Sequence, residues 1–205
     1  MHIGNDRLES FCDGVFGFAI TLLILEIKIP DFNDAHSSAD IWNSLKNQWP
    51  SWFAFGLSFI TLLIAWVNHH HLLRFAEHAT QRLIWVNFAH LFMVSLVPFS
   101  TAWVADTKLA AVPVFVYAAV FVLVNLAYIP FEWHALASAS LEEISARTQR
   151  FAKIRSLFTL GTFVIAMLVA LKFPSLGFGL ICCTLLVYLR PKALDSDEDA
   201  GHVET

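Results

Sequence analysis

Long apolar segments alternate with short polar stretches along the whole chain. Six of the apolar segments reach the roughly 20 residues that a helix needs to cross the core of a bilayer. We predict six transmembrane helices at residues 8–30, 51–73, 83–104, 112–134, 155–172 and 174–190. Pro30 is expected to end the first helix and Pro113 to start the fourth, because proline fits a helix interior poorly. Pro98 should kink the third helix, and Pro174 should start the sixth after a tight hairpin.

Composition and charge favour an all-α integral membrane protein. Hydrophobic residues make up 57% of the 205 residues and charged residues only 15%, against about 25% charged residues in soluble domains. Cytoplasmic loops carry most Lys and Arg in membrane proteins. With the amino terminus inside, the basic residues left outside are only four of 13: Lys28, Lys46, Lys108 and Lys172. We therefore expect both termini in the cytoplasm, an outward loop over residues 31–47, a six-helix membrane domain over residues 1–192, and an acidic, disordered cytoplasmic tail over residues 193–205.

One stripe of the first predicted helix is apolar. At about 100° per residue, its members follow one another at spacings of three and four: Phe11, Gly14, Phe18, Leu22, Leu25 and Ile29. Thr21 lies on the shoulder of this stripe, and Asp13 points away from it, roughly 140° from Phe18. On pattern alone the stripe is typical of a lipid-facing or packed surface.

Asp13 is costly inside a membrane helix, so it marks a candidate functional site. Polar residues of the second and third helices lie at a similar depth, roughly 6 to 11 Å from the inner boundary: Asn68, His69, Asn87 and His90. We predict a polar layer in which imidazole, amide and indole donors meet the carboxylate. The alternative is that Asp13 is a solvent-exposed residue at the start of the helix and that Arg7 only anchors the chain on the cytoplasmic side. His69–His71 would then be the solvent-exposed end of the second helix.

Three motifs resemble one family of channels. They are Arg7 followed by Phe11-Cys12-Asp13-Gly14, then Trp66-Val67-Asn68-His69-His70, then Asn87 with Ser95–Thr101. These motifs resemble the transmembrane protein 175 family, the endosomal and lysosomal potassium channels and their prokaryotic relatives. The resemblance covers about the first half of the chain closely, and the rest only as helices of matching number.

The resemblance implies a fold, an assembly and an activity. Prokaryotic members have one six-helix unit per chain and form homotetramers, in which the first helix of each subunit lines a central potassium-conducting pore. The resemblance places a hydrophobic constriction at Phe18, Leu22 and Leu25, with the Thr21 hydroxyl nearby. It also implies a signature and packing network that holds the first helix to the second and third: Arg7, Phe11, Cys12, Asp13, His69, His70 and Asn87. We expect a multi-pass protein of the plasma or inner membrane.

Two residues depart from the family pattern. Cys12 stands where the family usually has serine, and a thiol is the weaker hydrogen-bonding group. Phe18 stands where relatives usually carry isoleucine or leucine at the first constriction. Four phenylalanines around one axis would fill more of the pore, which bears on its conductance and selectivity.

The predicted mechanism is passive conduction, because an apolar ring can close by dewetting and the sequence has no phosphate-binding glycine loop to power transport. No pairing of a nucleophile with a base suggests an enzyme. We expect no metal and no cofactor, with K⁺ as the permeant ion, and no nucleic-acid partner. Gly177 and Gly179 resemble part of the carbonyl-lined selectivity filter of ordinary potassium channels. They lie at the start of the last predicted helix, which would be too short to span the membrane without them, so we assign them to close helix packing.

Two other classes stay open on the sequence alone. The first is a haem or metal protein, because several histidines lie toward the cytoplasmic side of the predicted helices: His69, His70, His90 and His134. Adjacent histidines point in different directions on a helix, which weighs against that class. The second is a proton-coupled transporter that uses Asp13 or Glu26, although the internal repeats typical of transporters are not seen.

Overall fold

The computed structural model describes residues 5–28, 37–76, 80–138 and 146–188, and all regular secondary structure in them is helical. The elements are α1 (Asn5–Leu22), the 3₁₀ helix η1 (Leu23–Glu26), α2 (Ser38–Asn47), α3 (Trp49–Arg74), α4 (Gln81–Val94), α5 (Val97–Asp106), α6 (Ala111–Ser138), α7 (Ala146–Ala170) and α8 (Pro174–Tyr188). The predicted all-α fold is confirmed for these residues.

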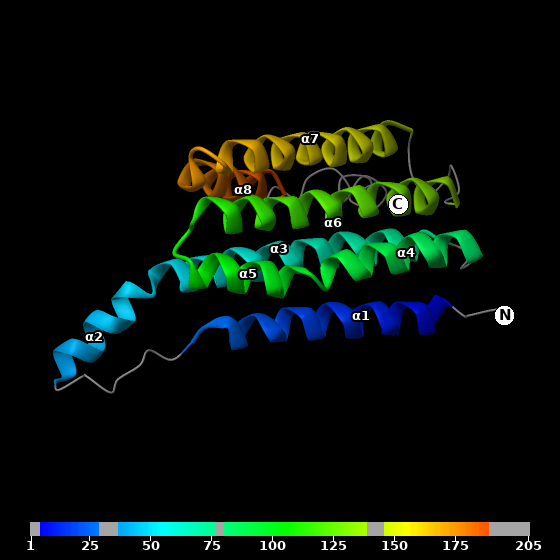
Figure 1. The fold of residues 1–205 in the computed structure, drawn as a ribbon. Coiled ribbons are helices and arrows are strands. Elements are labelled where there is room, and N and C mark those ends of the chain that lie inside the picture. Colours follow the sequence, from blue (N-terminus) through cyan, green and yellow to red (C-terminus); the bar gives the residue numbers. More distant parts are fainter. Residues whose placement is uncertain (1–4, 29–36, 77–79, 139–145, 189–205) are drawn as a thin grey trace, which may run out of the picture.

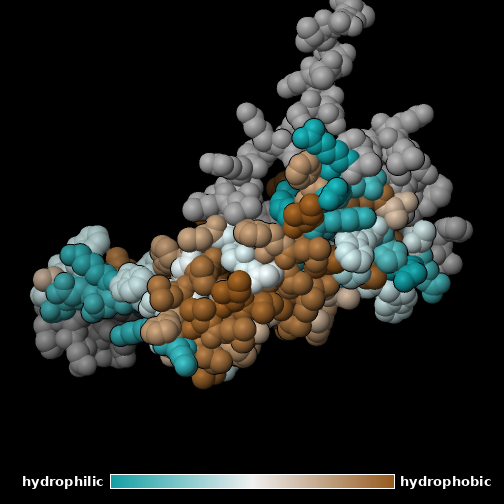
Figure 2. Space-filling view, turned by 90° about the horizontal axis from the view of Figure 1, so that it is seen from above, coloured by the Kyte–Doolittle hydropathy of each residue, from teal (hydrophilic) through white to brown (hydrophobic). Residues whose placement is uncertain are grey.

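Five helical segments within the described residues are long and apolar enough to cross a membrane: Asp6–Glu26, Trp49–Arg74, Gln81–Asp106, Ala111–Ala137 and Arg147–Ala170. The sixth predicted span corresponds to α8, which has 15 residues and falls short of spanning length over the part described. Hydrophobic side chains cover the middle of the face seen in Figure 2, and hydrophilic ones gather toward its two ends. This distribution suits a chain that crosses a bilayer.

The helices lie side by side in successive layers (Figure 1). α1 lies at one edge and packs against α3, α4 and α5, while α7 and α8 lie at the opposite edge and pack against α6. α6 joins the two groups, because it also contacts α4 and α5. α1 is therefore covered by neighbouring helices on one side only.

The third predicted helix is broken, and the predicted effect of Pro98 is confirmed. α4 ends at Val94, and α5 begins at Val97 with Pro98 in its first turn. Proline has no backbone N–H, and its ring would clash with the carbonyl group four residues earlier, so a continuous helix is disfavoured here. The hairpin before Pro174 is also confirmed, since only Leu171 to Phe173 separate α7 from α8.

Several predicted boundaries are wrong. The first α-helix ends at Leu22 and continues only as η1 to Glu26, while Pro30 lies outside the described residues. The fourth helix begins at Ala111, so Pro113 lies in its first turn as predicted, but the helix runs through Pro130 to Ser138, beyond the predicted end at residue 134. The fifth begins at Ala146 and not at residue 155, because its polar first turns are still good helix formers. The predicted tail over residues 193–205 lies outside the described residues.

The predicted outward loop contains a helix. α2 starts with a capping box, in which the Ser37 hydroxyl accepts a hydrogen bond from the Asp40 backbone N–H at 3.3 Å. The Asp40 carboxylate in turn accepts from the Ser37 backbone N–H at 3.0 Å. Two of the free donors at the helix start are satisfied in this way, which stabilises a short helix that hydropathy does not reveal.

Candidate functional site

α1 has a buried face and an uncovered face. The buried face repeats every three or four residues and is at most 3% exposed: Leu8, Cys12, Phe16, Ala19 and Leu23. On the uncovered face the side chain of Phe18 is 66% exposed and that of Leu25 is 71% exposed. An amphipathic helix in water would expose polar residues here, whereas this helix exposes large apolar ones.

The predicted constriction residues all border this uncovered face. Phe18, Thr21 and Leu25 are exposed, and Leu22 is half-buried at its edge. A shallow groove of about 620 Å³ follows the same face, from Ser10 and Phe11 to Leu22. The Thr21 hydroxyl donates to the Phe18 backbone oxygen at 2.9 Å, so its lone pairs stay available. No helix of this chain, within the described residues, covers Phe18 or Leu25.

A buried hydrogen-bonded junction fixes α1 on its other side. The Asn87 amide of α4 donates to Cys12 Sγ at 3.1 Å. The Asn87 carbonyl oxygen lies 2.6 Å from His69 Nε2 of α3, so that nitrogen carries the proton and donates. Cys12, Asn87 and His69 are each at most 1% exposed. Three helices are thus joined at one point, because each side chain comes from a different helix.

A second set of contacts lies beside this junction. The indole N–H of Trp66 donates to Asp13 Oδ1 at 2.8 Å. His70 Nδ1 lies 3.0 Å from Glu9 Oε1. Glu9 and Asp13 are four residues apart on α1, and Trp66 and His70 are four apart on α3, so two matched helix faces meet here. These contacts set the rotation of α1 about its own axis.

The structure does not bring every predicted network residue into these contacts. Arg7 is exposed and makes no hydrogen bond or ion pair with the residues described. Phe11 contacts Phe88 of α4 edge to face, with 5.7 Å between ring centroids, while more than half of its surface stays exposed. The predicted indole donor to Asp13 is confirmed and is Trp66, which was not named in the network, and Glu9 was missed. Their signal in the sequence is the matched spacing of four, which becomes informative only once the facing helices are known.

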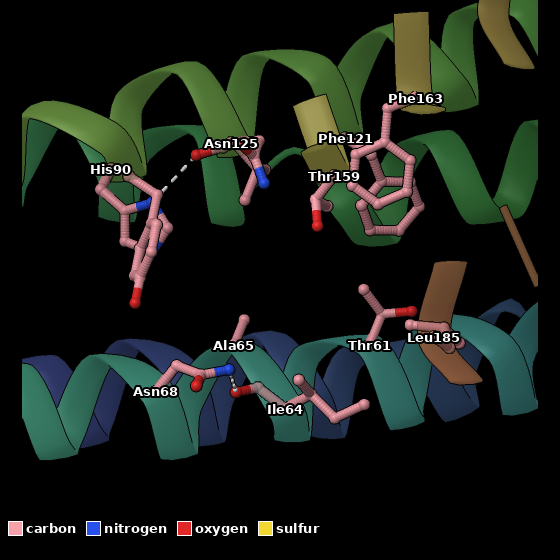
Figure 3. A pocket seen from close by; sticks show the side chains of 12 residues that line it. Thr61, Ile64, Ala65, Asn68, His90, Phe121, Asn125, Thr159, Phe163 and Leu185 are labelled. Carbon is pink, nitrogen blue, oxygen red and sulfur yellow. Dashed lines mark hydrogen bonds between the residues drawn. The ribbon is translucent and has the colours of Figure 1, made fainter. Parts of the chain in front are cut away.

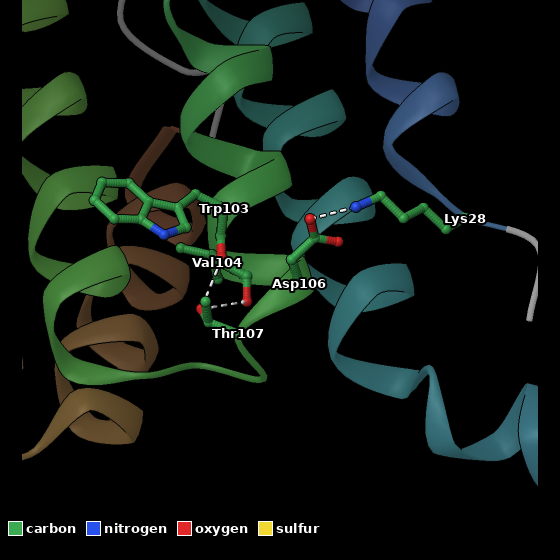
Figure 4. A network of polar contacts seen from close by, with 5 residues as sticks. All are labelled: Lys28, Trp103, Val104, Asp106 and Thr107. Atoms are coloured by element: carbon green, nitrogen blue, oxygen red, sulfur yellow. Dashed lines mark hydrogen bonds and ion pairs between the residues drawn. The ribbon is translucent and has the colours of Figure 1, made fainter.

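The far end of the first helix is held separately. Lys28, just after η1, forms an ion pair with Asp106 at the end of α5 (Figure 4). Beside it the Thr107 hydroxyl bonds to the Trp103 and Val104 backbone oxygens, at 2.7 and 3.4 Å, and so closes the last turn of α5. α1 and η1 are therefore attached to the neighbouring helices at both ends.

The arrangement of the histidines does not suit haem. His69 and His90 stack in parallel, with 5.7 Å between ring centroids and an 11° interplanar angle, so their nitrogens do not converge on one iron. Glu9, Asp13 and His70 do place ligand atoms within 4.8 Å of one another, which the sequence did not reveal. Their contacts with one another and with Trp66 account for this grouping without a metal ion.

Comparison with known proteins gives consistent matches. Residues 7–98 match the family described as endosomal/lysosomal potassium channel TMEM175. A potassium channel of Streptomyces collinus is 36% identical over 188 residues, which cover 89% of each chain. A potassium channel of Chamaesiphon minutus is 32% identical over 186 residues, covering 89% of this chain and 91% of that protein.

A solved structure also matches over nearly the whole chain. The crystal structure of a lysosomal potassium-selective channel TMEM175 homologue from Chamaesiphon minutus superposes with a TM-score of 0.80. The two are 29% identical in sequence, and the match covers 90% of this chain and 96% of that one. The matched family and relatives are ion channels and not enzymes.

Proposed function

The chain belongs to the TMEM175 family, and from this premise we propose that it is a potassium-permeable cation channel. Ions pass passively through a pore that α1 lines. The observation that carries this proposal is the uncovered apolar face of α1 and η1, on which Phe18 is 66% and Leu25 is 71% exposed. A patch of this kind needs a partner surface, and in a channel subunit the partner is a second copy of the same face.

A single subunit offers one such face, so several copies must surround an axis to enclose a pore. We propose a homotetramer, the assembly that the family resemblance implies. Rings of Phe18, Leu22 and Leu25 then form the narrow part of the pore, with Thr21 beside them. Narrow apolar rings exclude water, so a cation must lose hydration to pass, and a small widening restores it. The ring itself therefore closes the pore to ions, and no separate segment is needed to block it.

The buried junction has a supporting role in this mechanism. Side chains on a helix point in fixed directions, so the rotation of α1 decides whether Phe18 faces the axis. The bonds from Asn87 to Cys12 and from Trp66 to Asp13 hold that rotation. Asp13 itself lies off the pore-lining face and does not contact the ion.

We also propose that α8 crosses the membrane as the sixth helix. Its 15 residues, which include Leu186 to Tyr188, span roughly 22 Å at 1.5 Å per residue. Six crossings leave both termini in the cytoplasm, in agreement with the distribution of Lys and Arg. The channel then resides in the plasma or inner membrane.

Potassium flux from liposomes tests the proposal. The purified protein is compared with a Phe18→Asn variant, with sodium measured in parallel. A polar ring should hold water, so we expect Phe18→Asn to increase flux and to change the ratio of potassium to sodium. Phe158→Asn on α7 is the matched control, because Phe158 is 59% exposed on a helix remote from α1.

The control should leave flux and selectivity unchanged. Absence of flux from every variant, in correctly inserted samples, would contradict the channel. Equal effects of the two substitutions would contradict the assignment of α1 as the pore helix.

A further inference from the structure

A partly open cavity of about 60 Å³ lies between α3 on one side and α6 with α7 on the other, and α4 and α8 contribute His90 and Leu185 (Figure 3). α3, α6 and α7 each contribute two or more lining residues, including Thr61, Ala65, Phe121, Asn125, Thr159 and Phe163. Trp66 and His70 lie on a different face of α3, where they meet α1. The cavity is therefore separate from the proposed pore.

Three buried polar side chains line this cavity, and each has one polar atom without a hydrogen-bond partner among the described residues. His90 and Thr159 are each 1% exposed, and Asn125 is 8% exposed. His90 Nε2, Asn125 Oδ1 and Thr159 Oγ1 have no hydrogen-bond partner among the described residues. An unsatisfied buried polar atom costs about 1–3 kcal/mol, so three in one cavity point to an occupant that bonds to them.

The chemistry of the three atoms defines the head group of that occupant. His90 Nδ1 lies 3.2 Å from the Val124 backbone oxygen, which only accepts, so Nδ1 carries the proton. In the neutral ring Nε2 is then an acceptor, and the amide oxygen of Asn125 is another. The Thr159 hydroxyl both donates and accepts. The occupant must therefore donate a hydrogen bond, as a hydroxyl group does.

The surroundings of the cavity disfavour a charged occupant. Asn68, on its α3 wall, accepts a hydrogen bond from Arg155 Nη2 at 3.2 Å. Arg155 and the buried Glu132 together line a smaller adjoining cavity of about 20 Å³. A positive and a negative group lie at the same end, so neither a cation nor an anion is favoured over a neutral molecule.

The remaining wall is apolar and suits a compact hydrophobic body. Phe121 and Phe163 stack with 5.5 Å between ring centroids, and Ile64, Val124, Tyr128 and Leu185 also line the cavity. The volume is several times the 10–15 Å³ that one buried water requires. The lining, mostly apolar with a few convergent polar atoms, is of the kind that small-molecule sites have.

We propose that this cavity binds a small neutral amphiphile, an alcohol or a phenol. Its hydroxyl donates to one of the two acceptors, Asn125 Oδ1 or His90 Nε2, and accepts from the Thr159 hydroxyl. Its apolar body packs on Phe121 and Phe163. Molecules of this kind dissolve in the bilayer that surrounds the subunit, so the membrane supplies the ligand.

Phenol and toluene are the probes, since they differ in the hydroxyl group alone. We measure the melting temperature of the detergent-purified protein against ligand concentration. Phenol should stabilise the wild type saturably, and toluene should bind at least about tenfold more weakly. Asn125→Leu fills the cavity and removes an acceptor, so it should weaken phenol binding by about tenfold or more.

Thr159→Val keeps the side-chain shape and tests the hydroxyl contact even if Asn125→Leu does not fold. It should weaken phenol binding several-fold. Leu123→Ala is the matched control, because Leu123 is 41% exposed on α6 and does not line the cavity. A stabilisation that never saturates, or one that Thr159→Val and Asn125→Leu leave unchanged, would overturn the proposal.

A crystal structure grown with phenol gives the second readout. Density for phenol between Asn125 and Phe163 supports the proposal, and ordered water alone at the three polar atoms overturns it. The measurements need no ion gradient, so a negative result here is distinct from failure of the proposed channel activity.

Discussion

The helices around α1 and the pair α7–α8 are held together in different ways. α1 is joined to its neighbours by directional contacts, such as Asn87 to Cys12 and Trp66 to Asp13. α7 and α8 instead approach closely at Gly177, where an added Cβ would lie 2.8 Å from both Ala166 O and Ala170 Cβ. Hydrogen bonds fix the rotation of a helix, whereas small residues fix only how closely two helices approach.

This difference explains where a recognisable motif appears. Directional contacts require particular residue types at particular positions, and the family match over residues 7–98 includes Cys12, Asp13, Trp66 and Asn87. Close packing requires only that side chains be small, so α7 and α8 leave a weaker pattern in the sequence. The part that orients the proposed pore is thus the part that sequence comparison detects most readily.

The largest effect is expected where the packing is closest. Gly177→Leu must push α8 away from α7, and we expect a loss of about 3 kcal/mol in the free energy of unfolding. Thermal unfolding in detergent measures it. Gly179→Leu is the control, because an added Cβ there meets nothing within 4 Å, and its effect should stay below about 1 kcal/mol. Equal losses would show that α7 and α8 are not held by close approach.

A smaller effect is expected at the buried junction. Asn87→Leu removes the donor to Cys12 and the acceptor of His69, and it should cost about 2 kcal/mol because His69 stays buried without its partner. Adding His69→Phe should recover most of that loss, since both polar groups are then gone. Unfolding in denaturant measures both variants. A double variant that is no better than Asn87→Leu would contradict a role for the hydrogen bond.

The smallest effect concerns Cys12. Sulfur is a weak acceptor, so Cys12→Ser should strengthen the bond from Asn87 and change the melting temperature by the equivalent of less than about 1 kcal/mol, in the stabilising direction. Cys183→Ser is the control, because Cys183 is exposed, and it should have no effect. If Cys12→Ser lowers the melting temperature, the packing of the larger sulfur atom contributes more to stability than the hydrogen bond from Asn87 does.

Much of the fold followed from the sequence because hydropathy and proline act locally. The apolar spans, the break at Pro98 and the start of α8 at Pro174 are such features. The end of α1 was missed, since the apolar pattern continues through Leu23 to Leu25 and does not distinguish an α-helix from a 3₁₀ turn. α2 was missed because its capping box lies in a polar segment that hydropathy treats as a loop.

The candidate site was predictable only in part. Helical spacing placed Phe18, Leu22 and Leu25 near one face, since that geometry depends on α1 alone. The pairing of Asp13 with Trp66, and of Glu9 with His70, depends on how α1 and α3 are rotated relative to each other. The cavity depends on several helices at once, and its lining residues are far apart in sequence. Local patterns carry no information on such combinations.

The break between α4 and α5 has a mechanical consequence for α1. α4 holds α1 through Asn87, whereas α5 holds the segment after η1 through Asp106 and Lys28. Ser95 and Leu96 form a joint between these two attachments. The first helix is therefore held at two places by two separate helices, and not by one continuous helix.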